Sequence, residues 1–186
     1  MISHSKLKHI ITNIQNKKIL VVGDIMLDKY VFGLVDRISP EAPIPIVRVE
    51  NTKLSEGGAG NVIKNLNSLG IKTSFISVIG NDESGKLLKA RFKKLKNIEY
   101  ALLQDNSRNT TLKTRYMANG QQLLRTDQET AIPLNTIFKQ KVLKYFKLFM
   151  TQADIIIFSD YGKGLFIDEN FCKKLIKLAN LKNKKV

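Results

Sequence analysis

The sequence has 186 residues, of which 43% are apolar, enough for one domain with a hydrophobic core rather than a disordered chain. Its 31 Lys and Arg against 16 Asp and Glu give a net charge of +15, which suits anionic partners such as phosphorylated metabolites, nucleic acid or an anionic membrane. The single cysteine excludes an internal disulfide framework, and no apolar run could span a bilayer or serve as a signal peptide, so we expect a cytoplasmic protein.

Strands and helices are predicted to alternate along the chain. Residues 18–24 form a short apolar run that ends at Gly23, which is typical of a strand buried on both faces. Similar core strands are predicted over residues 73–79, 98–103 and 154–159. Helical spacing of apolar residues predicts helices over residues 57–70, 82–95, 134–150 and 168–181. This alternation indicates a mostly parallel sheet covered by helices.

Two segments do not fit that layering. Residues 44–56 have the composition of strands, and residues 111–127 form a predicted hairpin because Asn119-Gly120 is a strong two-residue turn signal. We interpret them as a small β-sheet lid beside the main sheet. The expected organisation is one α/β domain over residues 1–186, with lid segments at about 31–56 and 110–128.

The last residues indicate a further strand. Residues 183–186 resemble residues 16–19, which lead into the first predicted strand. A doubly wound sheet would place another strand here. We therefore expect a fold whose C-terminal part is missing.

Two aspartates follow predicted strands at equivalent places, Asp24 after the first and Asp160 after the last. Ligands of open α/β sheets bind beyond the carboxyl ends of the strands, where a carboxylate can accept hydrogen bonds from sugar hydroxyls. A turn or helix-capping role is the alternative for either aspartate alone. The pair favours a ligand pocket.

A glycine-rich segment, residues 56–61, leads into a predicted helix. Gly57 and Gly58 would let a ligand approach the backbone, and the start of the helix offers unpaired N–H groups. Asn61, one turn into the helix, could point its side-chain amide at the same ligand. A tight strand-to-helix turn is an equally good interpretation.

Other motifs carry weaker signals. Residues 80–86 nearly match a phosphate-binding P-loop, but Leu87 stands where a Ser or Thr would hold magnesium, so we favour a turn capped by Asp82. The two histidines lack partners at ligand spacing, and we expect no metal site. Cys172 falls among apolar positions of the last helix and is expected in the core, although the lysines that follow it would lower its pKa if it were exposed.

Lys113 and Arg115 alternate along one strand of the predicted hairpin and would share a face. That face could meet a phosphate, and a solvated outer face is the alternative. No nucleic-acid reader module or interleaved aromatic set accompanies the charge, so we expect neither nucleic acid nor membrane as a partner.

Together these residues resemble the ribokinase superfamily, and more narrowly the D-glycero-β-D-manno-heptose 7-phosphate kinases. The Ile-Ser-Pro-Glu-Ala-Pro and Asp-Tyr-x-Lys-Gly segments are the most specific to the heptose branch. The resemblance covers nearly the whole chain from about Lys18 onward. The matching stretches are residues 21–28, 37–45, 57–61, 80–85, 114–115, 121–125 and 159–164.

The resemblance implies ATP-dependent phosphorylation of a phosphorylated heptose under a β lid that excludes water during transfer. Lys113, Arg115 and Arg37 would contact the substrate phosphate from the lid, whereas the others would hold the sugar. The implied substrate-binding residues are Asp24, Asp28, Arg37, Gly57, Gly58, Asn61, Lys113, Arg115 and Asp160. ATP and Mg²⁺ are expected of the intact family, and their binding by this chain is doubtful.

The chain departs from the family in one respect. Family members carry a general base in a Gly-Ala-Gly-Asp segment of the C-terminal half, where most nucleotide contacts also lie, and that segment is absent from this sequence. Phosphoryl transfer needs both a base and an anion-binding site. We assign no catalytic residue, and expect the N-terminal part of a heptose-phosphate kinase that is inactive alone.

Two other hypotheses stay open. One is a non-catalytic module that binds a phosphosugar or forms a homodimer through its lid, because unpaired strand edges template pairing. A separately encoded C-terminal half is a further candidate partner. The other hypothesis is a basic nucleic-acid-binding protein, whose binding would depend on salt.

Overall fold

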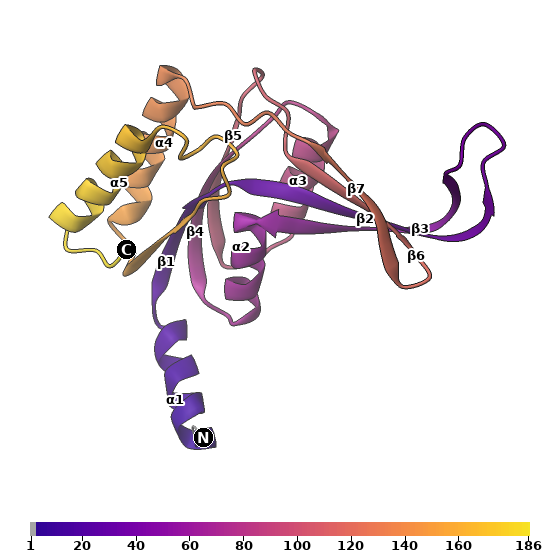
Figure 1. Ribbon diagram of the computed structural model, residues 1–186. Coiled ribbons are helices and arrows are strands. Elements are labelled where there is room, and N and C mark those ends of the chain that lie inside the picture. Colours follow the sequence, from indigo (N-terminus) through magenta and orange to yellow (C-terminus); the bar gives the residue numbers. More distant parts are fainter. Residues whose placement is uncertain (1–2) are drawn as a thin grey trace.

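A computed structural model of the chain describes residues 3–186. Two four-stranded sheets are present, and each belongs to a different part of the molecule (Figure 1). We call the larger part the body and the projecting sheet the arm. The body sheet has the order β5-β4-β1-β8, all parallel, and the arm sheet has the order β3-β2-β6-β7.

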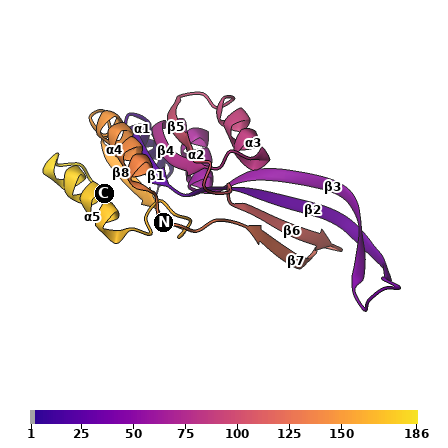
Figure 2. The ribbon, with the colours of Figure 1, turned by 90° about the horizontal axis from the view of Figure 1, so that it is seen from above.

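The body is a three-layer α/β/α unit. Its strands are β1 (Lys18–Gly23), β4 (Lys72–Ile79), β5 (Ile98–Gln104) and β8 (Ile155–Ser159). Helices α4 (Thr136–Met150) and α5 (Glu169–Leu181) pack on one face of the sheet, and α2 (Ala59–Ser68) and α3 (Glu83–Phe92) on the other (Figures 1 and 2). β1 is buried on both faces, with Leu20 facing one core and Val21 the other. The predicted α/β class and the second small sheet are confirmed.

The arm consists of two hairpin-like pairs joined side by side. Its strands are β2 (Ile25–Ile38), β3 (Pro45–Gly58), β6 (Leu112–Ala118) and β7 (Gln121–Gln128). β2 pairs antiparallel with β3 and parallel with β6. The predicted turn between β6 and β7 is confirmed, since Asn119 and Gly120 both have positive φ, 51° and 78°.

The arm begins at Ile25, earlier than the position near residue 31 predicted from the sequence. β2 was not predicted as a strand because its burial changes along its length: residues 25–27 are buried, and residues 36–38 are exposed. No single period-two alternation runs through such a strand.

The strand order places a topological switch point in the body. From β1 the chain adds β4 and then β5 on one side, and later returns to add β8 on the other side of β1. Gly23 at the end of β1 pairs with Ser159 at the end of β8. The arm leaves β1 at this same edge, so the switch point and the arm root adjoin each other.

Two features lie at the chain ends. α1 (His4–Gln15), which the sequence analysis did not predict, projects from the body (Figure 1), and Gln15 donates a side-chain hydrogen bond to the Leu69 carbonyl at 2.8 Å. The strand predicted at residues 183–186 is present as an isolated parallel bridge between Lys185 and Ile155. Among residues 3–186, no helix is both long and apolar enough to cross a membrane.

Candidate functional site

The switch point is organised around the carboxylate of Asp24, which is buried with 5% of its surface exposed. Its Oδ2 accepts hydrogen bonds from the backbone N–H groups of Tyr161 (3.1 Å) and Lys163 (3.0 Å), and its Oδ1 accepts one from Leu165 (3.1 Å). The backbone N–H of Asp24 donates to the Ser159 carbonyl at 3.1 Å. Asp24 therefore holds the loop after β8 against the end of β1, and its predicted contact with sugar hydroxyls stays a prediction.

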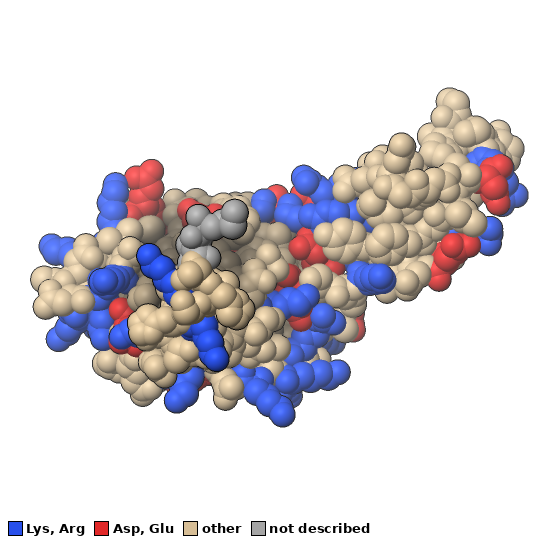
Figure 3. All heavy atoms as spheres, turned by 90° about the horizontal axis from the view of Figure 1, so that it is seen from below, with Lys and Arg blue, Asp and Glu red and all other residues tan. Residues whose placement is uncertain are grey.

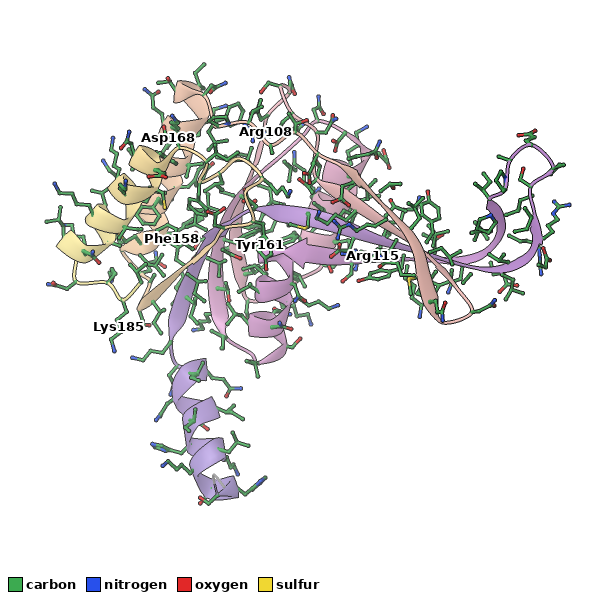
Figure 4. The ribbon with its side chains drawn as sticks, in the orientation of Figure 1. Arg108, Arg115, Phe158, Tyr161, Asp168 and Lys185 are labelled. Atoms are coloured by element: carbon green, nitrogen blue, oxygen red, sulfur yellow. The ribbon has the colours of Figure 1, made fainter. Side chains whose placement is uncertain are left out.

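Asp160 and Tyr161 start that loop. Asp160 is exposed, and its carboxylate accepts the Gly162 N–H at 2.8 Å, closing a turn within the loop. Tyr161 is half exposed beside the arm root, where its ring lies close to Gly58 (Figure 4). Asp24 and Asp160, which the sequence analysis grouped together, both lie at the loop after β8. Asp24 is buried beneath this loop, and Asp160 lies on its surface.

The glycine segment forms a strand-to-helix turn at the arm root. Gly58 has φ 57° and ψ −131°, and a Cβ there would lie 2.5 Å from the Asp24 carbonyl oxygen, so only glycine fits without strain. That carbonyl accepts the Ala59 N–H at 2.9 Å, which joins the start of α2 to the end of β1. Asn61 follows in the first turn of α2 and is exposed.

Asp28 lies one step along the arm and faces Arg115. The Nη1 of Arg115 donates to Asp28 Oδ1 at 2.6 Å, and the guanidinium stacks 5.1 Å from the centre of the Tyr30 ring. The Asp28 hydrogen bond raises the pKa of Arg115 further above its ordinary value. The other oxygen, Oδ2, lies so close to Gly57 that any side chain there would collide with it. Asp28, Gly57 and Arg115 are thereby brought together, and their contact with a substrate stays a prediction.

Lys113 belongs to a second charged group at the root of the β6–β7 hairpin. Its Nζ lies 2.6 Å from Asp127 and 3.8 Å from Glu129, and Lys163 of the loop after β8 pairs with Glu129 at 2.8 Å. The hydrogen bond from Lys113 lowers the pKa of Asp127, with Arg125 adding to the effect. The sequence analysis missed Glu129 and Lys163 as site residues, although Lys163 stands in the same motif as Asp160.

Arg37 lies apart from this group. It is exposed near the distal end of β2, about 30 Å along the strand from Asp28 at about 3.3 Å per residue. Its neighbours there are Asp36, Ile46 and Arg48. This structure does not bring Arg37 to the other predicted residues because the arm extends away from the body, and its contact with substrate stays a prediction.

The segment resembling a P-loop is a capped turn, as favoured from the sequence. Asp82 accepts the Gly85 N–H at 2.8 Å and the Thr110 N–H at 2.7 Å, so its carboxylate uses the amides that would otherwise face a phosphate. Within the described residues, no three His, Cys, Asp or Glu side chains are grouped so that they could hold a metal ion.

A buried ion pair that the sequence did not reveal fixes the base of the hairpin. The Nε of Arg108 donates to Asp105 at 2.8 Å, and its other nitrogens donate to the carbonyls of Ile132 (3.3 Å) and Pro133 (3.4 Å). Arg108 thus connects the segment that enters β6 with the segment that leaves β7 (Figure 4).

Comparisons with known proteins identify the family of this chain. Residues 16–185 match the pfkB family carbohydrate kinase. The chain belongs to this family. The bifunctional protein HldE of Acidiphilium cryptum is 43% identical over 155 residues, which cover 83% of this chain and 32% of that protein. The protein of the same name from Helicobacter pylori is 41% identical over 168 residues, covering 90% of this chain and 36% of that protein. This pfkB-family chain therefore spans about a third of the length of these relatives.

Solved structures show the same fold. A carbohydrate kinase from Agrobacterium tumefaciens superposes with a TM-score of 0.69 at 21% identity, and the ribokinase of Giardia lamblia with 0.68 at 17%. In both cases the match covers 90% of this chain and 52% of the solved one. The pfkB-family fold is thus present here over about half of its length in those kinases.

The arrangement suits a small polar ligand with a negative charge. The Asp28 carboxylate at the arm root can accept hydrogen bonds from hydroxyls, while Lys113, Arg115 and Lys163 supply positive charge beside it. On the face drawn in Figure 3, Lys and Arg side chains are dispersed over body and arm with Asp and Glu among them, rather than gathered in one basic patch.

Proposed function

We propose that this chain supplies the sugar-phosphate side of the active site of an ATP-dependent carbohydrate kinase that acts on heptose 7-phosphate. It would serve ADP-heptose synthesis for the lipopolysaccharide core, in the cytoplasm. The observation that carries the proposal is the grouping of Asp28, Gly57 and Arg115 at the arm root, next to the switch point of a pfkB-family sheet.

Each group has a role in the proposal. Asp28 accepts hydrogen bonds from sugar hydroxyls, and the absence of a side chain at Gly57 leaves room for the Asp28 carboxylate. Asn61 adds its amide from the start of α2. Lys113 and Arg115 attract the phosphate, and the arm limits the access of water to the bound sugar.

ATP and Mg²⁺ are assigned to the half of the kinase fold that this chain does not cover. Residues 80–86 do not fit a triphosphate, because the Asp82 carboxylate is hydrogen-bonded to the amides of Gly85 and Thr110. The general base belongs to that other half in this proposal. We therefore expect the 186-residue chain to bind the sugar phosphate without transferring phosphate to it.

Two measurements on the purified chain test the proposal: phosphate transfer from ATP to heptose 7-phosphate, and the shift in melting temperature caused by the sugar phosphate. We expect no transfer and a raised melting temperature. Asp28→Asn should weaken binding about tenfold or more, because a charged acceptor is lost. Asp36→Asn is the matched control, an exposed aspartate on the same strand that pairs with Arg48 at 3.7 Å.

The outcomes are distinct. Binding that is equally weakened by both variants, or no binding by the wild-type chain, would refute the sugar site. Measurable turnover would show that this chain also holds a catalytic base. The expectation that the chain is inactive alone would then be wrong.

A second candidate, a module that forms a homodimer through the arm, is favoured by one observation. β7 is an edge strand whose eight residues are all exposed, including Leu123 and Leu124. Such an edge can pair with the same edge of another copy. Sedimentation equilibrium should then show a dimer that Thr126→Pro disrupts, and a monomer at all concentrations would rule it out.

A further inference from the structure

Five charged side chains form a connected network where the β6–β7 hairpin meets the loop after β8. Arg125 pairs with Asp127 at 3.0 Å, and Asp127 pairs with Lys113 at 2.6 Å. Glu129 then connects Lys113 (3.8 Å) with Lys163 (2.8 Å). Three cations and two carboxylates leave this network with a charge of +1.

The two lysines converge on Glu129 from segments 50 residues apart in sequence. Their side chains are only 14% and 19% exposed, for Lys113 and Lys163 respectively, so water screens them incompletely and each needs an anion beside it. The backbone of Lys163 is held by its hydrogen bond to Asp24. The lysine pair is therefore a fixed anion-binding arrangement, and the anion in it is the protein's own carboxylate.

The two carboxylates differ in how firmly they are held. Asp127 lies within β7, paired across the hairpin with Lys113, and receives Arg125 as well. Glu129 lies just beyond β7, in a segment without regular structure. The backbone of Asp127 is held in the β6–β7 ladder, whereas that of Glu129 lies outside it, so Glu129 can move away from the lysines more easily.

We propose that Glu129 is an internal competitor for the phosphate of the substrate, occupying the Lys113–Lys163 site until a phosphate displaces it. A phosphate group carries up to two negative charges and three acceptor oxygens, so it can satisfy both lysines better than one carboxylate does. A neutral sugar, or one with a single carboxylate, carries no more charge than Glu129 and cannot displace it. Glu129 thereby selects for phosphorylated ligands. Only the identity of the sugar in this inference rests on the proposed function.

Removing the competitor should increase phosphate affinity. The apparent dissociation constant of a site equals its intrinsic value divided by the fraction of molecules in which the site is open. Glu129→Gln keeps the size of the side chain and removes the charge, so the fraction of open sites rises. We expect binding about tenfold tighter.

The test is isothermal titration of the 186-residue chain with inorganic phosphate. Glu99→Gln is the matched control, because Glu99 is a surface carboxylate that pairs with Lys18 at 3.2 Å, near the start of β1. It changes the net charge by the same amount at a distant place. We expect Glu129→Gln to tighten phosphate binding and Glu99→Gln to leave it unchanged. Lys163→Gln should abolish the gain when combined with Glu129→Gln, with circular dichroism verifying that each variant is folded.

Other results would overturn the inference. Phosphate binding that is unchanged or weaker in Glu129→Gln, or equally tightened in Glu99→Gln, means that Glu129 does not compete. So does an absence of phosphate binding in both the wild type and Glu129→Gln. A parallel titration with heptose 7-phosphate keeps the two proposals separate. If phosphate binding tightens in Glu129→Gln but the heptose does not bind, the competitor stands and the proposed sugar is wrong.

Discussion

Lys163 donates its backbone N–H to the Asp24 carboxylate at 3.0 Å, and its side chain pairs with Glu129 at 2.8 Å. One residue thereby joins the end of β1 to the segment that returns from the arm. The loop after β8 and the arm root are consequently positioned by the same few contacts. A substitution of Asp24 should therefore destabilise both the loop after β8 and the arm root.

Asp24→Asn should lower the free energy of unfolding by about 2 kcal/mol, because hydrogen bonds to a charged acceptor are lost and an amide NH₂ group now faces backbone donors. Urea denaturation measures the effect. Asp160→Asn is the control, since this exposed aspartate accepts one N–H, from Gly162, and should cost less than about 0.5 kcal/mol. Equal losses in the two variants would contradict the role assigned to Asp24.

Gly58→Ala and Gly120→Ala separate steric collision from backbone strain. Both glycines have positive φ, but a Cβ at Gly58 would lie 2.5 Å from the Asp24 carbonyl oxygen, whereas Gly120 has open space around it. We expect a loss of about 1 kcal/mol at Gly120 from strain alone, and of about 3 kcal/mol at Gly58. Thermal unfolding compares them. A loss at Gly58 no larger than that at Gly120 would mean that the turn adapts.

The features that the sequence predicted well are those encoded locally. The turn at Asn119-Gly120 needs positive φ at two residues, which glycine and asparagine adopt readily. The Asp82 cap involves only Asp82 and the Gly85 N–H, three residues further along the chain. The body strands were equally visible, because burial on both faces leaves a continuous apolar run such as that of β1.

The features that it missed depend on distant partners. In the sequence, nothing distinguishes Arg108 from the many other cationic residues. Its contacts with Asp105 and the Ile132 carbonyl are visible only in the folded chain. Likewise, nothing near Glu129 indicates that Lys163 will reach it. The arm root was missed for another reason: β2 passes from a buried environment to solvent, so its sequence follows no single period.

Cys172 should react slowly with alkylating reagents. Burial raises the pKa of its thiol, and the carboxylates of Asp160 and Glu169 raise it further, outweighing the opposite effect of Lys173. The sequence left open whether Cys172 is packed in the core or exposed and reactive. In the structure its side chain packs against the core formed with α4 and α5. At pH 8, iodoacetamide should modify the folded chain about tenfold more slowly than the chain unfolded in urea.

Because this is the only cysteine in the sequence, the reaction gives a single rate. Asp160→Asn should increase that rate modestly, since one of the two nearby carboxylates is removed. Equal rates for the folded and unfolded chains would show that the thiol is neither shielded nor perturbed.

The Asp105–Arg108 pair should make stability depend on pH in acid. Burial alone would raise the pKa of Asp105, but hydrogen bonds from Ser107 and from Arg108 outweigh it and lower the pKa below its ordinary value. A carboxyl whose pKa is lowered in the folded state stabilises the protein above its unfolded pKa of about 3.9, and this stabilisation is lost as the pH falls through the lowered value.

Asp105→Asn leaves the buried Arg108 without its counter-charge and should cost about 3 kcal/mol near pH 7. The difference from the wild type should shrink below about pH 4, where the carboxyl of the unfolded wild type begins to take up a proton while that of the folded protein still carries its charge. Urea denaturation between pH 7 and pH 3 measures both free energies, and the other acidic groups cancel in the difference. Asp36→Asn, an exposed control, should show a small difference that hardly varies with pH.

Ser107→Ala is a milder probe, because it removes one hydrogen bond of 2.6 Å to Asp105 and should move the acid transition to higher pH. A difference between Asp105→Asn and the wild type that stays constant down to pH 3 would mean that the carboxyl of Asp105 is not the group that titrates.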